Sequence, residues 1–298
     1  MYPFPQSILV ILCSLVFVRH DIEAQTEGTT IPRSAQFQAQ AAMGRLNASE
    51  GGKLVLRAIE AHGGLEAWYS APTSAYSWEY SNAGMNLRFK SYLVADNASR
   101  RVYHRITELG TPENPQPAEG RFAWDGNEAW ISPAEIKQPN PRFWAATGYY
   151  FESIPFVLAD PGISYERLPD ENLDGVAHDM VRISYDESIG DSPGDLYTLY
   201  VNQDTGLVAA IRYTVSFGRT KVQASSRPVR ETLFYYDDYV TVDGLTVPTH
   251  FRGYGFSDGK RGSFKNEAWA SEFSFRQPFD ASQLIMPSEG RVQPMPGR

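Results

Sequence analysis

Four histidines are the residues of this sequence best suited to proton transfer or metal binding: His62, His104, His178 and His250. A neutral imidazole can act as a general base or hold a metal ion. His62 comes just before Gly63, where a histidine can bond the last carbonyls of a helix, so we interpret it as helix punctuation. The other three stand alone in predicted strands, without HxH or HExxH spacing, and we predict no metal site.

Carboxylates and nucleophile motifs give no stronger catalytic signal. The chain has no GxSxG, no P-loop and no GxGxxG. Glu60 and Glu66 do not make a convincing glycosidase pair, because such a pair is defined by its placement in space. The acidic segment 186–195 carries oxygen ligands of the kind that calcium prefers, but its spacing does not match the twelve-residue calcium loop. We therefore predict a non-enzymatic protein with no cofactor and no metal.

The charge of the chain argues against one class of partner. It has 27 Lys and Arg against 35 Asp and Glu, a formal net charge of −8, and no cluster of basic residues. An acidic surface repels phosphate backbones, so we expect no nucleic-acid binding.

An apolar run near the N-terminus predicts export. Residues Ile8–Val18 are too few to span a bilayer comfortably but fit the core of a secretory signal, with a cleavage point after Ala24. The only cysteine, Cys13, lies in this run, so the mature chain would have no disulfide and no thiol nucleophile. No later run is long and apolar enough to cross a membrane. We predict a periplasmic or secreted protein.

The rest of the chain divides into a leader, one large domain and a tail. Residues 25–48 are polar and predict a flexible leader, helical near its end. A helix is expected over 49–62, with Ser49 at its start and Gly63 as its left-handed cap. A single β domain is predicted over 49–292, and 293–298 form a coil tail.

Alternating apolar residues predict a strand-rich domain. Tyr76, Trp78 and Tyr80 recur with period two, and segments with turn residues follow, such as Asp125-Gly126 and 242–244. An aromatic segment in mid-chain breaks the pattern and is partly helical. About ten or eleven antiparallel strands with short turns favour a mainly β (α+β) fold. Its core would be a large curved antiparallel sheet, a half-open barrel covered by a few helices.

A curved sheet of this size either packs tightly or leaves an apolar concavity. Concave apolar sites suit lipids and other apolar ligands. Strand alternation shows which residues share a face but does not show which face is concave. The candidate lining residues are Trp78, Leu87, Phe89, Phe151, Phe156, Leu199, Val201 and Phe234. A fully packed core without a ligand is the simpler alternative.

The order of elements resembles the bacterial outer-membrane lipoprotein carrier superfamily (LolA/LolB-like) and its periplasmic relatives. The segments that carry this resemblance span about residues 50–292; they are LVLRAIEAHGGLEAW, YYFESIPFVLADPG, LYTLYVNQDTGLVAAIRY, YYDDYVTVDGLTVPTHF and FDASQLIMPSEGRV. The resemblance implies a half-open, strongly curved antiparallel sheet with helices as a lid, and an apolar concavity that holds acyl chains. The chain is longer than a typical carrier, and no position matches a gating arginine.

Together these observations predict an exported protein that binds a lipid or the acyl chain of a lipoprotein. Carriage of lipids or lipoproteins and sensing in the cell envelope would both suit such binding, and an envelope protein is a second expected partner. Two alternatives stay open. One is an exported hydrolase that uses His104, His178 or His250 with nearby carboxylates. The other is a structural or partner-binding envelope protein with a filled core.

Overall fold

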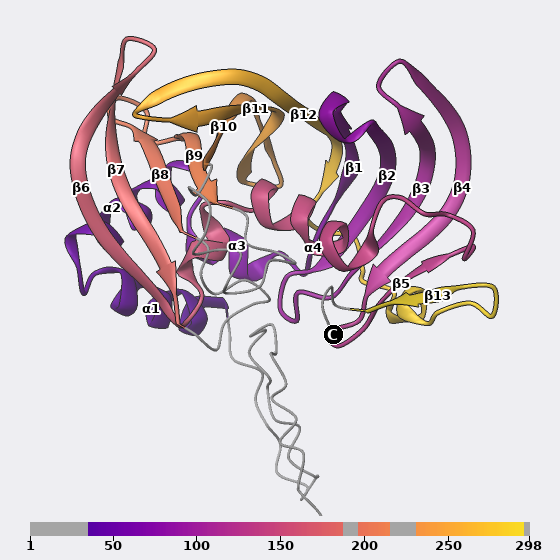
Figure 1. Cartoon of the computed structure of the whole chain (residues 1–298). Helices are drawn as coiled ribbons and strands as arrows, with labels where there is room; N and C mark the ends of the chain where they lie inside the picture. Colours follow the sequence, from indigo (N-terminus) through magenta and orange to yellow (C-terminus); the bar gives the residue numbers. More distant parts are fainter. Residues whose placement is uncertain (1–34, 187–195, 215–230, 295–298) are drawn as a thin grey trace, which may run out of the picture.

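One continuous antiparallel sheet organises the molecule. The structure is a computed structural model that describes residues 35–186, 196–214 and 231–294. Within these ranges thirteen strands pair in the order β13-β5-β4-β3-β2-β1-β12-β11-β10-β9-β8-β7-β6. The two edge strands, β13 and β6, do not pair with each other, so the sheet stays open and curves into a trough (Figure 1).

The strands are connected mostly by short turns between neighbours. Their bounds are β1 Thr73–Asn82, β2 Leu87–Asp96, β3 Val102–Thr111, β4 Asn114–Trp124, β5 Ala129–Ser132, β6 Ile163–Leu173, β7 Val176–Tyr185, β8 Tyr197–Asn202, β9 Val208–Thr214, β10 Glu231–Val242, β11 Leu245–Ser257, β12 Lys260–Ser274 and β13 Arg291–Gln293. The predicted turn at 242–244 joins β10 to β11 through Asp243 and Gly244, whose φ angles are 54° and 89°. Positive φ at both positions is what a two-residue hairpin of right-handed twist requires.

Four α-helices and three short 3₁₀ turns complete the described chain. Their bounds are α1 Ala35–Leu46, α2 Glu50–Ala61, α3 Leu65–Ser70, α4 Pro141–Glu152, η1 Ala83–Met85, η2 Phe156–Ala159 and η3 Ala281–Leu284. Helix α2 begins as predicted, because the Ser49 hydroxyl accepts a hydrogen bond from the Gly52 amide at 3.0 Å. It ends at His62, and Gly63 follows with a φ of 117°. None of the helices in the described ranges is long and apolar enough to cross a membrane.

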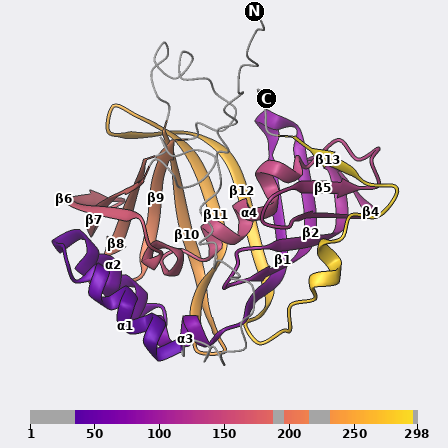
Figure 2. The same cartoon turned by 90° about the horizontal axis from the view of Figure 1, so that it is seen from below.

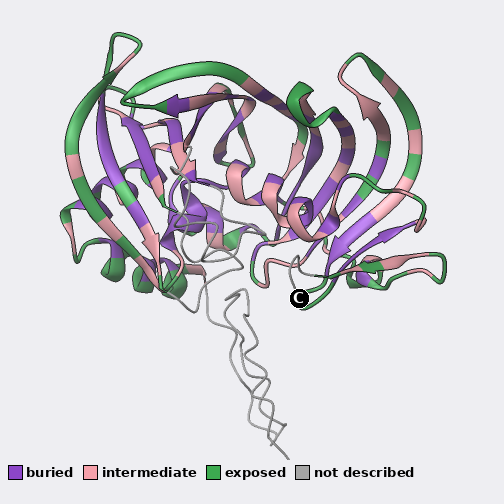
Figure 3. Cartoon of the chain, viewed as in Figure 1, coloured by how far each residue is buried: buried purple, intermediate pink, exposed green. Residues whose placement is uncertain are grey.

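The helices cover the sheet from two places. Helices α1, α2 and α3 pack together at one end of the trough, where α2 contacts β6 and β7. Helix α4 lies inside the trough, against β3, β4 and β5 (Figures 1 and 2). We call the face that these helices cover the concave face. Buried residues concentrate there, while the outer rims of the long strands are exposed (Figure 3).

The predicted fold class is confirmed: the sheet is large, curved, antiparallel and half-open, and a few helices cover it. It has thirteen strands rather than ten or eleven. Helix α1 lies within the predicted leader and buries Ala39, Ala42 and Leu46, so the packed unit includes residues 35–46. The predicted signal segment 1–24 lies outside the described residues.

Candidate ligand site on the concave face

The eight candidate lining residues come together in one apolar cluster. Seven of them are buried, and the half-buried Phe151 packs against them. They come from six elements: β1, β2, α4, η2, β8 and β10. The structure thus places all eight on the concave face or in the helical layer above it. That any of them contacts a ligand stays a prediction.

The cluster has a sheet layer and a covering layer. Trp144 of α4 packs on two sheet residues, with ring centroids 4.2 Å from Tyr80 and 5.3 Å from Phe89. Phe151 of α4 reaches the other half of the sheet, where its ring lies 5.4 Å from Phe234. Phe156 belongs to the covering layer, because it stacks on Trp68 of α3 at 4.8 Å. The apolar face that a ligand would need is therefore occupied by aromatic side chains from α4 and η2.

A buried histidine fixes the middle of α4 to the sheet. His104 of β3 lies 2.9 Å from the Ala145 carbonyl through Nε2 and 2.9 Å from Ser91 Oγ through Nδ1. A carbonyl can only accept, so Nε2 carries the proton and Ser91 donates to Nδ1. Burial lowers the pKa of His104 to about 3, which keeps the ring neutral. The ring also stacks on Phe122 at 4.0 Å.

The C-terminal half of α4 is held by three further side chains, one of which is Tyr185 of β7, whose hydroxyl bonds that of Tyr150. Arg100, in the turn between β2 and β3, donates to the Tyr149 hydroxyl and binds both oxygens of Asp160 at 2.6 and 2.8 Å. Tyr236 of β10 donates to the Phe151 carbonyl at 2.9 Å. At the start of α4, Arg142 donates to the Asn127 carbonyl at 3.1 Å. Single hydrogen bonds thus attach α4 along its length, and aromatic rings make many of its other contacts with the sheet.

Three polar atoms where α4 meets β1 have no hydrogen-bond partner among the described residues. They are the Tyr76 hydroxyl and the Trp78 indole nitrogen on β1, and one carboxyl oxygen of Glu152 on α4. All three side chains are at most 2% exposed. The other oxygen of Glu152 accepts a bond from Ser153 at 3.1 Å. A buried polar group without a partner costs about 1–3 kcal/mol, so this seam between β1 and α4 is unfavourable as it stands.

Glu152 is uncharged at neutral pH. Burial raises the pKa of its carboxyl from 4.5 to about 8, and the Ser153 hydroxyl opposes that shift only in part. The sequence pattern marks the mid-chain segment as aromatic and partly helical, but it gives Glu152 no role. A single acid between the aromatic run 149–151 and the apolar run 154–156 is the signal that could have found it.

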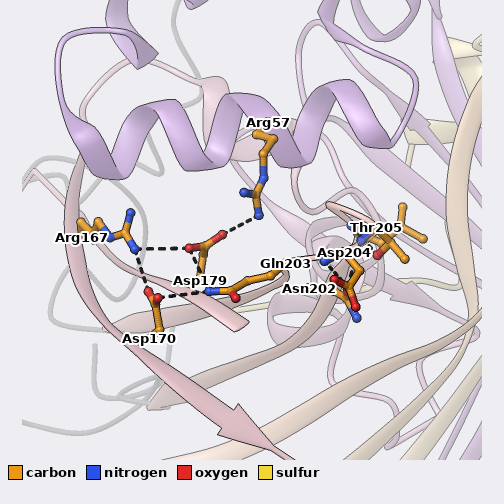
Figure 4. A network of polar contacts seen from close by, with 9 residues as sticks. Arg57, Arg167, Asp170, Asp179, Asn202, Gln203, Asp204 and Thr205 are labelled. Carbon is orange, nitrogen blue, oxygen red and sulfur yellow. Dashed lines mark hydrogen bonds and ion pairs between the residues drawn. The ribbon is translucent and has the colours of Figure 1, made fainter. Parts of the chain in front are cut away.

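Helix α2, in contrast, is attached by a complete polar network. Asp179 of β7 is 2.6 Å from Arg57 of α2 and 3.3 Å from Arg167 of β6 (Figure 4). Gln203 adds a contact to Asp179 at 3.4 Å, and Arg167 also binds Asp170 at 2.7 Å. Figure 4 shows these side chains meeting between α2 and the strands below it.

His62 secures the other end of α2, and both of its ring nitrogens have partners. Nδ1 lies 2.7 Å from the Thr246 carbonyl, and Nε2 accepts from the Val208 amide at 3.2 Å. The pKa of His62 is lowered to about 4 by burial, so it bonds to β11 and β9 as a neutral ring. The interpretation of His62 as helix punctuation agrees with its position as the C-cap of α2.

The three strand histidines do not meet. His104 lies beneath α4, His178 contacts the Val176 carbonyl at 2.9 Å, and His250 pairs with Glu267 at 2.6 Å. No two of them share a hydrogen-bond partner in the described chain, so the three histidines do not form a common site. His250 is the one that pairs with carboxylates: Glu267 and, at 3.7 Å, Asp238. In the described part of the chain, no group of three or more His, Cys, Asp or Glu side chains is placed to hold a metal ion. Of the acidic segment 186–195, which was considered for calcium, only Asp186 is described. Residues 187–195 lie outside the described ranges.

A shallow apolar groove of about 490 Å³ lies elsewhere, between the end of β10, β11 and an irregular part of β12. Val240, Trp269 and Phe273 contribute to its wall. None of the eight candidate residues lines it, so this groove is separate from the predicted site.

Comparison with known proteins concerns the fold. No family model matches the chain, and no curated protein matches it in sequence. The chain is similar to the solved structure of a LolA superfamily protein from Nitrosomonas europaea, with 11% identity and a TM-score of 0.49 over 80% of this chain and 98% of that one. It is also similar to an outer membrane lipoprotein-sorting protein domain from Vibrio parahaemolyticus, with 11% identity and a TM-score of 0.39 over 84% and 97%.

A third similar structure is a chain of the MucA/MucB complex of Pseudomonas aeruginosa, with 10% identity and a TM-score of 0.23 over 74% of this chain and 93% of that one. The expected LolA-like architecture is visible in the molecule itself, as an open curved sheet whose concave face is covered by helices.

Proposed function

We propose that this protein binds an acyl chain or a similar apolar lipid between the concave face of its sheet and α4. The observation that supports this proposal is the nature of the cover. A continuous apolar face lies beneath a helix that packs on it through aromatic rings, with single hydrogen bonds from His104, Arg100, Tyr236 and Tyr185. Such a cover can be exchanged for another apolar surface.

Binding requires that α4 moves. The lining residues already pack against Trp144 and Phe151, so a ligand must replace those rings on the sheet. An acyl chain is a suitable replacement, because each methylene that it buries contributes about 0.8 kcal/mol. The ligand would then stabilise a second arrangement, in which α4 packs on the acyl chain instead of on the sheet.

The proposed setting is the periplasm or the cell exterior, in line with the apolar N-terminal run. Binding without chemistry would serve the carriage of a lipid or lipoprotein, or the sensing of one together with an envelope protein partner. The two roles differ in whether the ligand is passed on.

The first test is to express the full-length chain, purify the exported protein and analyse its organic extract by mass spectrometry. We expect a stoichiometric acyl species. Hydrogen exchange of the delipidated and lipid-loaded protein supplies the second readout. Amides of α4 should change protection on loading, while amides of α2 serve as the internal control and stay constant.

A lipid-free protein that also fails to bind a fluorescent fatty acid would rule the proposal out. The filled-core alternative would then be the better description of the molecule. Loading that protects α2 and α4 equally would place the ligand elsewhere and contradict the proposed site.

A further inference from the structure

The unpartnered polar atoms beneath α4 lie on two surfaces that face each other. Tyr76 and Trp78 alternate on β1 and therefore point to the same side of the sheet, with ring centroids 6.2 Å apart. On α4, Gly148 and Glu152 are one helical turn apart and share a face. A Cβ atom at Gly148 would lie 3.3 Å from the Trp78 indole nitrogen, so the helix backbone approaches Trp78 closely. Glu152 influences the titration of Tyr76, which places these two groups at the same seam.

The groups around Glu152 are neutral. Tyr76, Tyr149 and Tyr236 are the titratable groups that interact with it electrostatically, and Ser153 is its hydrogen-bond partner. No described Arg or Lys contributes to the pKa of Glu152; Arg100 bonds the Tyr149 hydroxyl and is paired with Asp160. The seam therefore offers hydrogen-bond donors, namely a phenol, an indole N–H and a protonated carboxyl, without a compensating positive charge.

These donors match an uncharged oxygen. An ester carbonyl or a hydroxyl can accept from Tyr76 and Trp78 and leave the seam without a net charge. An ionised carboxylate or a phosphate would enter a buried site that holds no cation, and burial of an unpaired charge is strongly unfavourable. A bare hydrocarbon would leave the three polar atoms unpartnered.

We propose that the seam formed by Tyr76, Trp78 and Glu152 is a subsite that recognises the neutral oxygen group of an acyl lipid, such as an ester or a hydroxyl. This inference rests on the proposed function, because the ligand reaches the seam only when its acyl chain lies beneath α4. The neutral head then bonds to the groups that α4 leaves unpartnered when it closes on the sheet.

The test compares three ligands of equal chain length: 1-monolaurin, laurate and dodecane. For each ligand, displacement of the fluorescent dye N-phenyl-1-naphthylamine from the purified full chain is measured at about pH 7. At this pH laurate is ionised and Glu152 is protonated. We expect monolaurin to bind about tenfold or more tightly than laurate or dodecane, since two added hydrogen bonds give an effect of this size.

Two variants remove single donors and keep an aromatic side chain: Tyr76→Phe removes only the hydroxyl, and Trp78→Phe replaces the indole by a smaller phenyl ring. Each should lower the ratio of monolaurin to dodecane affinity about fivefold, the effect of one hydrogen bond. The affinity ratio is the proper readout. Removal of a buried unpartnered group also stabilises the closed position of α4, and this lowers the affinity for all ligands by the same factor. Tyr200→Phe is the matched control, since Tyr200 is equally buried on the opposite face and bonds Glu171 there.

The outcomes separate the two proposals. If none of the three ligands displaces the dye, the proposed function fails. If all three bind with equal affinity, acyl binding holds but the subsite is wrong. An unchanged affinity ratio in Tyr76→Phe and Trp78→Phe, with both variants folded by circular dichroism, overturns the subsite as well.

Discussion

Helices α2 and α4 cover the same sheet, but they are attached in opposite ways. In α2 the polar groups that face the strands have partners: Arg57 binds Asp179, and both nitrogens of His62 are bonded. In α4, Glu152 faces β1 with one oxygen unpartnered, and two β1 side chains below it are unpartnered as well. Because unmatched polar atoms weaken a packed interface, we propose that α2 is the permanent cover and α4 the cover that can leave.

The backbone contacts show the same contrast. A Cβ atom at Gly51 of α2 would lie 3.0 Å from backbone atoms of Tyr165 and Arg167, so the helix rests directly on the edge strand β6. At Gly52 the same atom would be 2.1 Å from the Leu46 carbonyl at the end of α1. Helix α4 makes one comparable approach, at Gly148, and there its neighbour is the ring of Trp78. A ring can shift where a strand backbone cannot.

The response of stability to pH should separate the two helices most strongly. The pKa of Glu152 is raised from 4.5 to about 8, so the folded state keeps a proton that the unfolded state releases. Its contribution is complete below about pH 4.5 and is lost as the pH rises through 8. The loss is of the order of 5 kcal/mol. Because the affected contact is that of α4 with β1, we expect α4 to lose hydrogen-exchange protection first in alkaline solution.

The buried histidines act in the other direction. The pKa of His62 is lowered to about 4 and that of His104 to about 3, so the unfolded state binds protons that the folded state excludes. Their contribution is present above pH 6.5 and is lost as the pH falls through those values. Urea unfolding from about pH 4 to 9 should therefore show a maximum near pH 6.5. Glu152→Gln should remove the alkaline loss and keep the acid loss; an unchanged alkaline loss in that variant would contradict the assignment.

Gly52→Ala should destabilise the α1–α2 corner. The new methyl group would collide with the backbone at Leu46, and forced overpacking of this kind costs about 3 kcal/mol. Gly44→Ala is the control, because nothing lies within 4 Å of the added atom on the neighbouring helix α1. That change should stabilise the protein by about 0.5–1 kcal/mol. Thermal unfolding of the two variants should shift in opposite directions, and equal shifts would show that the close approach is not needed.

The sequence pattern predicted those helix ends and strand faces that depend on residues close together in the chain. Ser49 and Gly63 mark the ends of α2, and the alternation of Leu87 with Phe89 marks a strand with one buried face. The additional strands were less visible. Strand β13 has only three residues, and the first half of β4 is polar and contains Pro115 and Pro117. These segments become strands through their neighbours, so composition does not reveal them.

The candidate site shows the same limit. Period-two spacing placed Trp78, Leu199 and Phe234 on common faces of their strands, and all three lie in the concave cluster. The spacing did not show that α4 fills the trough, because the position of α4 depends on contacts between distant segments. Tyr76 and Glu152 are 76 positions apart in the chain, and only the folded sheet brings their unpartnered atoms to one seam.

Asp179→Asn tests the attachment of α2 with a smaller effect. The change removes the charge that Arg57 and Arg167 share, and Asp179 itself is only 8% exposed in its side chain. Both arginines are 43% exposed and can turn to water, so we expect a loss of about 1–2 kcal/mol rather than the larger cost of a fully buried pair.

Glu166→Gln is the matched control on the same hairpin. Glu166 pairs with Arg182 at 2.8 Å, but the two side chains are 61% and 44% exposed, and such surface pairs contribute at most about 0.5 kcal/mol. In urea unfolding, Asp179→Asn should lower stability more than Glu166→Gln, and its effect should persist in high salt, since screening acts mainly on the exposed pair. Hydrogen exchange adds the decisive contrast: Asp179→Asn should loosen α2 and leave α4 unchanged. If α4 loosened first, the distinction between a permanent and a removable cover would be wrong, because the polar network would then act on the whole helical layer.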